Sequence, residues 1–132
     1  MIDTITAEPL KEVNGVKFGM KREEVRKLFG EAKEFRKSKF SKNTTDDFGF
    51  CHVYYNTENQ CEAVEIFDTK VMVNGVFLFP TSLKNAKELL NGLAEHNGSF
   101  INIEKAVGIY APSGQMESIL FGAEGYYDFL TK

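Results

Sequence analysis

The chain has 132 residues, of which 42% are hydrophobic and 27% charged, and its net charge is −3. These values are ordinary for a globular protein and exclude a disordered or fibrous chain. A chain of this length can bury about two thirds of its surface around one core, so we expect a single domain over residues 1–132. Twelve Phe and five Tyr residues without any Trp favour pleated sheet.

The start of the chain and its apolar segments bear on location. No segment approaches the roughly 20 apolar residues that cross a bilayer, and the first residues lack the basic and apolar regions of a signal peptide. We therefore predict a cytoplasmic protein with no membrane partner. Cys51 and Cys61 are expected to be free thiols, because the hairpin predicted below places them on opposite faces.

Two related segments follow each other along the chain. The motif Val-Asn-Gly-Val at residues 13–16 returns at residues 73–76. The segment that begins Gln60-Cys-Glu resembles the one that begins Gln115-Met-Glu. Because both matches occur in the same order, we expect a duplicated unit.

Each unit, about residues 13–70 for unit one and 73–132 for unit two, is expected to contain a short helix after an initial strand pair. The Asn-Gly dipeptide of the repeated motif is typical of a type I′ turn between two strands. Apolar residues at helical spacing predict the first helix over residues 21–29. The second helix is predicted from a cap at residue 81 or 82 to about Gly98.

An antiparallel hairpin is expected after each helix. In unit one, strand-like segments flank a Glu58-Asn59 turn, which places Val53 opposite Val64 and His52 opposite Glu65. A Pro-Ser-Gly turn forms the corresponding hairpin of unit two. The predicted fold class is α+β, with two tandem helix-plus-antiparallel-hairpin units that form one antiparallel sheet and helices packed on one face.

The histidines are the imidazole bases of the chain, and neither predicts a catalytic site. His96 is expected at a helix end, where a cation interacts favourably with the helix dipole. His52 adjoins Cys51, but neighbours in a strand point to opposite faces. Because the cysteines also lack a C-x-x-C spacing, we predict no metal, no cofactor and no enzymatic activity.

Charge is distributed unevenly along the chain. Residues 11–42 contain eleven Lys or Arg and five acids, whereas residues 43–132 contain five and twelve. In residues 33–42, Phe35 and Phe40 alternate with cations, as in a site for single-stranded nucleic acid. The overall acidity disfavours phosphate binding, so the preferred interpretation is an exposed strand with inward Phe side chains.

Acidic residues along the hairpin of unit one point to a different partner. Carboxylates around a Tyr anchor suit capture of a basic protein surface, since charge speeds encounter and the aromatic ring supplies buried contact. The alternative is a solvated rim of the sheet. The candidate partner-binding residues are Asp46, Asp47, Tyr54, Glu58, Glu62, Glu65 and Asp68.

One segment resembles known families. Phe18-Gly19-Met20 precedes a short Glu-Val-x-x-Leu helix that ends in Gly. This pattern resembles the opening of the β-lactamase-inhibitor-like and SmpA/OmlA-like families of small bacterial proteins, and with the repeat the resemblance covers about residues 13–121. The chain departs from the pattern at Lys21, where a Ser or Thr cap is usual, and at Phe79-Pro80, where Phe-Gly is usual.

The resemblance implies a protein-binding scaffold whose sheet face or loops block an enzyme. A small, acidic protein of this kind without a leader resembles an immunity protein, which neutralises a secreted toxin such as a nuclease from a competing bacterium. We therefore predict a protein-binding inhibitor that occludes a cognate toxin with a basic surface. The alternative is a small-ligand-binding or enzymatic domain with a pocket between the two units.

Overall fold

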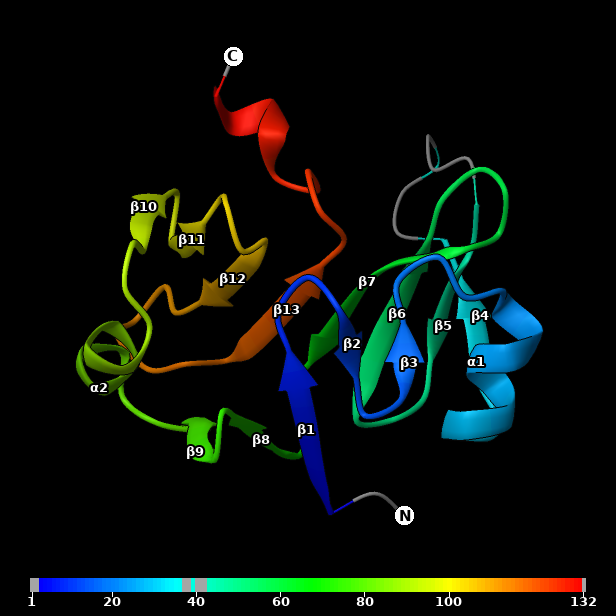
Figure 1. The fold of residues 1–132 in the computed structure, drawn as a ribbon, viewed down its shortest axis with the longest axis horizontal. Helices are drawn as coiled ribbons and strands as arrows, with labels where there is room; N and C mark the ends of the chain where they lie inside the picture. The colour runs from blue at the N-terminus through cyan, green and yellow to red at the C-terminus, as the bar shows by residue number, and fades with distance from the viewer. Residues whose placement is uncertain (1–2, 37–38, 40–42, 132) are drawn as a thin grey trace.

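Strands dominate the fold (Figure 1). The computed structural model describes residues 3–36, 39 and 43–131. The described chain is 44% strand and 15% helix, and its strands form two sheets of five and eight. The prediction of an α+β fold with a single antiparallel sheet and helices on one face is therefore wrong. Most of the missed strands have two to four residues, too few to show an alternation of polar and apolar side chains.

The first sheet, within the described residues, has five strands in the order β3-β2-β1-β8-β9. β1 and β8 are parallel, with Ile5 opposite Val71, and the other neighbours are antiparallel. Positive φ angles throughout Asn14-Gly15 and Asn74-Gly75 confirm the predicted type I′ turns. The strands are β1 (Thr4–Glu8), β2 (Glu12–Val13), β3 (Val16–Lys17), β8 (Lys70–Val73) and β9 (Val76–Phe79).

Eight strands of the described chain form the second sheet, in the antiparallel order β10-β11-β12-β13-β7-β6-β5-β4. The predicted hairpin register is confirmed, because Val53 lies opposite Val64 and His52 opposite Glu65. The strands are β4 (Lys33–Phe35), β5 (Thr45–Asp47), β6 (Cys51–Tyr55), β7 (Cys61–Ile66), β10 (Ala94–His96), β11 (Ser99–Asn102), β12 (Val107–Tyr110) and β13 (Ser118–Gly122).

Helix α1 (Arg22–Phe29) confirms the first predicted helix. Its N-cap residue, Lys21, makes no side-chain capping bond, as expected for a residue without a short acceptor side chain. A 3-10 helix, η1 (Asp128–Thr131), lies near the end of the chain. None of the helices in the described part of the protein is long and apolar enough to cross a membrane.

Helix α2 (Leu83–Leu89) begins where the sequence predicts and ends earlier. The Ser82 side chain caps its first turn by accepting a backbone hydrogen bond. The chain then turns at Gly92, which has a φ of 81°, and enters β10. The predicted extension to Gly98 is therefore wrong, and His96 lies on a strand rather than at a helix end.

The same order of elements occurs twice along the chain. A hairpin, a helix and four antiparallel strands run through β2–β7 and again through β8–β13. In both units a bridge ties the residue before the helix to the turn of the last hairpin, Lys21 to Gln60 and Ser82 to Gln115. Unit one lies on the right of Figure 1 and unit two on the left, and β7 pairs with β13 where they meet.

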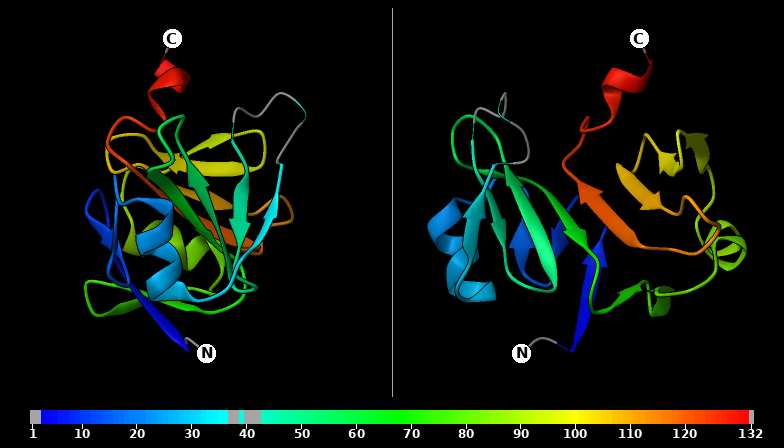
Figure 2. Two further views of the ribbon diagram at one scale, coloured as in Figure 1. Left: turned by 90° about the vertical axis from the view of Figure 1, so that its right-hand side faces the viewer. Right: turned by 180° about the vertical axis from the view of Figure 1, so that it is seen from behind.

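A buried core cluster joins side chains of both sheets and both α-helices, and the two chain ends lie at opposite ends of the molecule (Figure 2). A register shift between Tyr54 and Tyr55 turns Cys61 toward this cluster. Cys51 and Cys61 are free, as predicted, but the prediction that they lie on opposite faces is wrong. Burial raises the pKa of Cys61 to about 12, so its thiol stays protonated and unreactive.

Candidate protein-binding face

The eight-stranded sheet has one face turned away from the core cluster, which we call the outer face. Across its middle, the cross-strand neighbours His52, Glu65, Leu120 and Gly108 follow one another. The alternate residues of these strands, such as Val64, are fully buried in the core, so strand alternation directs this row outward. The buried apolar residues of both described α-helices belong to the core cluster, so these helices pack against the other face.

Glu65 lies where the two units meet, opposite Leu120. Tyr54 Oη donates a hydrogen bond to Glu65 Oε1 at 2.6 Å, and Ser118 Oγ donates one to Oε2 at 2.7 Å. Both donor residues are buried, so the carboxylate is held in one orientation. An open cavity of about 430 Å³ adjoins it. The cavity is lined by Tyr54, Glu65, Ser99, Gly108, Tyr110, Ser118, Leu120 and Tyr127.

The C-terminal segment packs on the outer face beside the cavity. Tyr127 lies over Gly108, where a Cβ atom would come within 2.2 Å of the Tyr127 hydroxyl oxygen. Tyr126 lies over Gly122, where a Cβ atom would come within 2.7 Å of the tyrosine Cβ and Cγ atoms. Glycine in a strand commonly permits such a close approach. The two glycines therefore make room for the two tyrosines.

Phenol groups around Glu65 hold their protons more tightly than an exposed tyrosine does. Burial, followed by the hydrogen bond to Glu65, raises the pKa of Tyr54 well above its usual value. Burial and the charges of Glu62 and Glu65 raise the pKa of Tyr126 to about 12. Burial, then the neighbouring Tyr126 and Glu65, also raise the pKa of Tyr127. These hydroxyls are therefore hydrogen-bond donors at neutral pH.

An aromatic group continues the outer face across unit one. The His52 ring packs against the rings of Phe35 and Phe67, with centroid distances of 4.9 and 4.7 Å. His52 Nε2 lies 3.8 Å from Asp47 Oδ1. Phe35 is therefore engaged with His52 rather than free to stack on a nucleic-acid base, whereas Phe40 falls outside the described residues.

The acidic residues predicted from the sequence do not form one cluster. Tyr54 and Glu65 are hydrogen-bonded to each other, and Asp47 lies on the same outer face beside His52. The three remaining acids lie in a turn, on a strand and in a link between strands, and each is partly or fully exposed. These residues are Glu58, Glu62 and Asp68.

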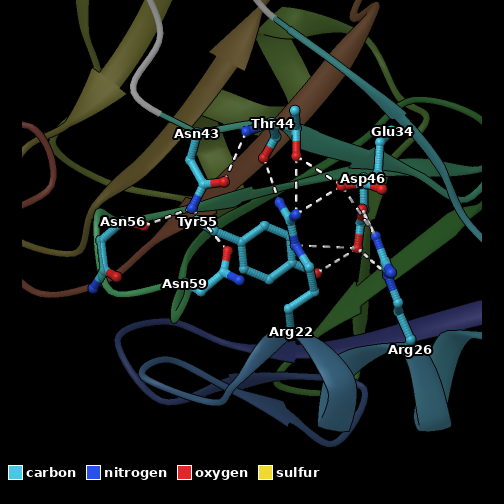
Figure 3. A network of polar contacts seen from close by, with 9 residues as sticks. All are labelled: Arg22, Arg26, Glu34, Asn43, Thr44, Asp46, Tyr55, Asn56 and Asn59. Carbon is cyan, nitrogen blue, oxygen red and sulfur yellow. Dashed lines mark hydrogen bonds and ion pairs between the residues drawn. The ribbon is translucent and has the colours of Figure 1, made fainter.

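Asp46 is fully buried, so its prediction as a contact residue is wrong. Arg26 donates from Nε and Nη2 to the two Asp46 oxygens, at 2.9 and 2.6 Å, and Tyr55 Oη donates at 2.9 Å (Figure 3). The hydrogen bond to Asp46 raises the pKa of Arg26 further above its usual value. Beside it, Arg22 bonds Glu34 at 2.9 Å and stacks over the Tyr55 ring at 4.2 Å. This group fastens α1 to the sheet.

Six residues that line the cavity were not among the predicted contact residues. They include Tyr110, Ser118 and Tyr127. Tyr110 lies opposite Ser118 in the last hairpin of unit two, and Tyr54 lies opposite Ala63 in the last hairpin of unit one. The two tyrosines therefore occupy corresponding positions in the two units. Comparison of the two repeats could have found Tyr110. Tyr127 gives no such signal, because its contact with β12 joins segments that are distant in the sequence.

Among residues 3–36, 39 and 43–131, no three His, Cys, Asp or Glu side chains are grouped so that they could hold a metal ion. No family model matches the chain, and no curated protein or solved structure is significantly similar to it. The functional proposal therefore rests on the geometry of the outer face and on the sequence resemblance.

Proposed function

We propose that this protein is a protein-binding inhibitor of the immunity type, which neutralises a cognate bacterial toxin by occluding it with the outer face. One observation carries the proposal. A carboxylate held by two hydrogen bonds lies beside tyrosines at an open cavity, on the sheet face opposite the described α-helices. Tyrosines around a polar centre are typical of binding hot spots.

The chemistry of the outer face favours a partner with a basic surface. Asp47 and Glu65 bring negative charge to this face, and charge complementarity raises the association rate. Tyr110 is 43% exposed at the cavity and can be buried by a partner. Burial of such a ring mainly slows dissociation. Occlusion therefore needs no catalytic group.

The toxin and the location are supported by the sequence. The resemblance to inhibitor-like families favours a bacterial enzyme or toxin as the partner. A cytoplasmic location is in keeping with the free, buried thiols of Cys51 and Cys61. An immunity protein in that compartment would meet toxin molecules after they enter the cell.

Protection of growth tests this function. The product of the gene adjacent to this one would be expressed in a bacterial host with and without this protein. We expect the wild-type protein to restore growth and the variant Asp47→Lys/Glu65→Lys to lose protection. Glu95→Lys is the matched control, because Glu95 is exposed on β10 and its cross-strand partner Phe100 faces the core. A wild-type protein that neither binds nor neutralises that product would refute the function.

Small-ligand binding is the second candidate function, because the cavity lies between the two units. Tyr54 and Glu65 come from unit one, and Ser118 and Tyr127 come from unit two. Polar groups that converge on a pocket are typical of ligand sites. A metabolite that raises the melting temperature of the wild-type protein, but not of Glu65→Gln, would favour this function over toxin inhibition.

A further inference from the structure

The negative charge of Glu65 has no counter-ion in the described protein. Its hydrogen-bond partners, Tyr54 and Ser118, are neutral hydroxyls. Among the residues that the structure describes, no Lys, Arg or His nitrogen lies within 4.0 Å of a Glu65 oxygen, whereas Asp47 has His52. Within the described residues, this partly buried carboxylate therefore lacks the cation that usually accompanies a charge removed from water.

Glu65 keeps hydrogen-bonding capacity for a ligand. A carboxylate offers about four acceptor sites, and the hydroxyls of Tyr54 and Ser118 use two of them. Because Glu65 also lines the cavity, a donor placed there can reach the carboxylate. A charged donor would form a shorter and stronger bond than a neutral donor.

The walls of the cavity suit a cation on an apolar stem. Tyr54, Tyr110 and Tyr127 line it, and a ring face attracts a cation within about 6 Å of its centroid. Leu120 adds an apolar surface that the methylene groups of a long side chain can cover. Tyr110 is half exposed, whereas Tyr127 is buried, so the rings range from the rim to the interior.

We propose that this cavity binds the cationic end of an arginine or lysine side chain presented by the partner protein. The inference rests on the proposed function and identifies the contact that gives it specificity. Glu65 supplies the charged acceptor, and the tyrosines supply the ring surfaces. The hydrogen bonds from Tyr54 and Ser118 orient the carboxylate before the partner arrives, which lowers the entropy cost of binding.

Titration followed by NMR tests the site on the full chain without the partner. The probe is N-acetyl-arginine amide, and the control is the citrulline analogue, which has nearly the same shape and no charge. We expect only the arginine probe to shift the amide signals of Gly108 and Leu120. Glu65→Gln should weaken its binding about tenfold or more, as loss of a charged hydrogen-bond partner does. Glu95→Gln, on β10, should leave its affinity unchanged.

Equal shifts with both probes, or an unchanged affinity in Glu65→Gln, would overturn the cation site. If that variant does not fold, Tyr110→Ser replaces it, because Tyr110 is exposed at the cavity. Its affinity for the arginine probe should fall about two- to fivefold, the worth of one cation–π contact. An unchanged affinity in this variant would likewise overturn the site.

The toxin itself separates a partner side chain from a free small cation. We expect Glu65→Gln to weaken toxin binding by about tenfold or more, as it weakens probe binding. The alternative result is that Glu65→Gln loses affinity for the probe but binds the toxin as tightly as the wild type. The cavity would then take a free cation. This result overturns the partner assignment and leaves the inhibitor function standing. If no toxin binds the wild-type protein, the inhibitor function fails, and this partner assignment fails with it, although the arginine probe still decides on the cation site.

Discussion

The two repeated units fasten their helices to the eight-stranded sheet by different chemistry. In unit one, Arg26 on α1 binds the carboxylate of Asp46 on β5. In unit two, Lys87 on α2 lies over the Phe100 ring on β11, with Nζ 4.7 Å from the centroid. Asp46 and Phe100 hold the same place in the two strand registers, so the two contacts correspond.

This difference shows that one topology accepts either a partly buried ion pair or a buried aromatic ring at the same place. The net contribution of a buried ion pair is small, because the loss of hydration offsets the attraction. Removal of one partner is costly, since the other charge is left without compensation. We therefore expect unit one to be the more sensitive of the two to single substitutions at this contact.

The ion pair of unit one should give the largest effect. Asp46→Leu removes both hydrogen bonds of Arg26 to the Asp46 carboxylate and leaves only its longer contact with Glu34, at 3.7 Å. The substitution should lower the free energy of unfolding by about 3 kcal/mol. We take the low end of the usual range because the Arg26 side chain is 36% exposed. Arg26→Met/Asp46→Leu removes both charges and should cost less than Asp46→Leu alone. Chemical denaturation of the two single variants and the double variant measures the coupling energy.

The same cycle in unit two is the control. Lys87→Met and Phe100→Leu each remove the cation–π contact between these two residues. Lys87 is exposed to solvent. Their coupling energy should be at most about 1 kcal/mol. Equal coupling energies in the two units would contradict the distinction between them.

The next largest loss of stability is expected at a strand position where unit one has a histidine and unit two has a glycine. His52 lies opposite Glu65 in unit one, and Gly108 lies opposite Leu120 in unit two, where Tyr127 covers it. Gly108→Ala should lower the free energy of unfolding by about 1–3 kcal/mol, because the new Cβ displaces Tyr127. Denaturation of the double variant Gly108→Ala/Tyr127→Phe should recover part of this loss. Strictly additive costs would show that the two residues do not meet.

The smallest effect separates arginine from lysine. Arg26→Lys loses the two-pronged bond to Asp46 and should lower the free energy of unfolding by about 1 kcal/mol. Lys87→Arg keeps a cation over Phe100 and should stay within about 0.5 kcal/mol of the wild type. Thermal melting of both variants makes the comparison. A larger loss for Lys87→Arg would reverse the proposed roles of the two contacts.

Local signals allowed part of this fold to be predicted. The Asn-Gly turns and the first helix depend on residues that are near in sequence, and they agree with the structure. The register of β6 and β7 was also predictable, because Val53 and Val64 share a buried face. The turn itself differs: a register shift at Tyr54 and Tyr55 turns Cys61 inward.

Distant contacts account for what the sequence did not reveal. Asp46 reads as a surface acid until Arg26, on another element, is known to lie against it. The parallel pairing of β1 with β8 joins residues more than sixty positions apart and leaves no pattern in either strand. The same holds for Tyr127 over Gly108. For the candidate site, Tyr54 with Glu65 was predicted, and the C-terminal wall of the cavity was not.

Cross-saturation NMR on the complex with the cognate toxin tests most directly whether the outer face is the binding surface. Saturation of the toxin protons should reduce the signals of Gly108, Tyr110 and Leu120, which line the cavity. It should spare Val76 and Phe77, which lie on β9 of the other sheet and are about as exposed as Tyr110. Loss of the Val76 and Phe77 signals, with those of the cavity unchanged, would contradict the proposed binding face.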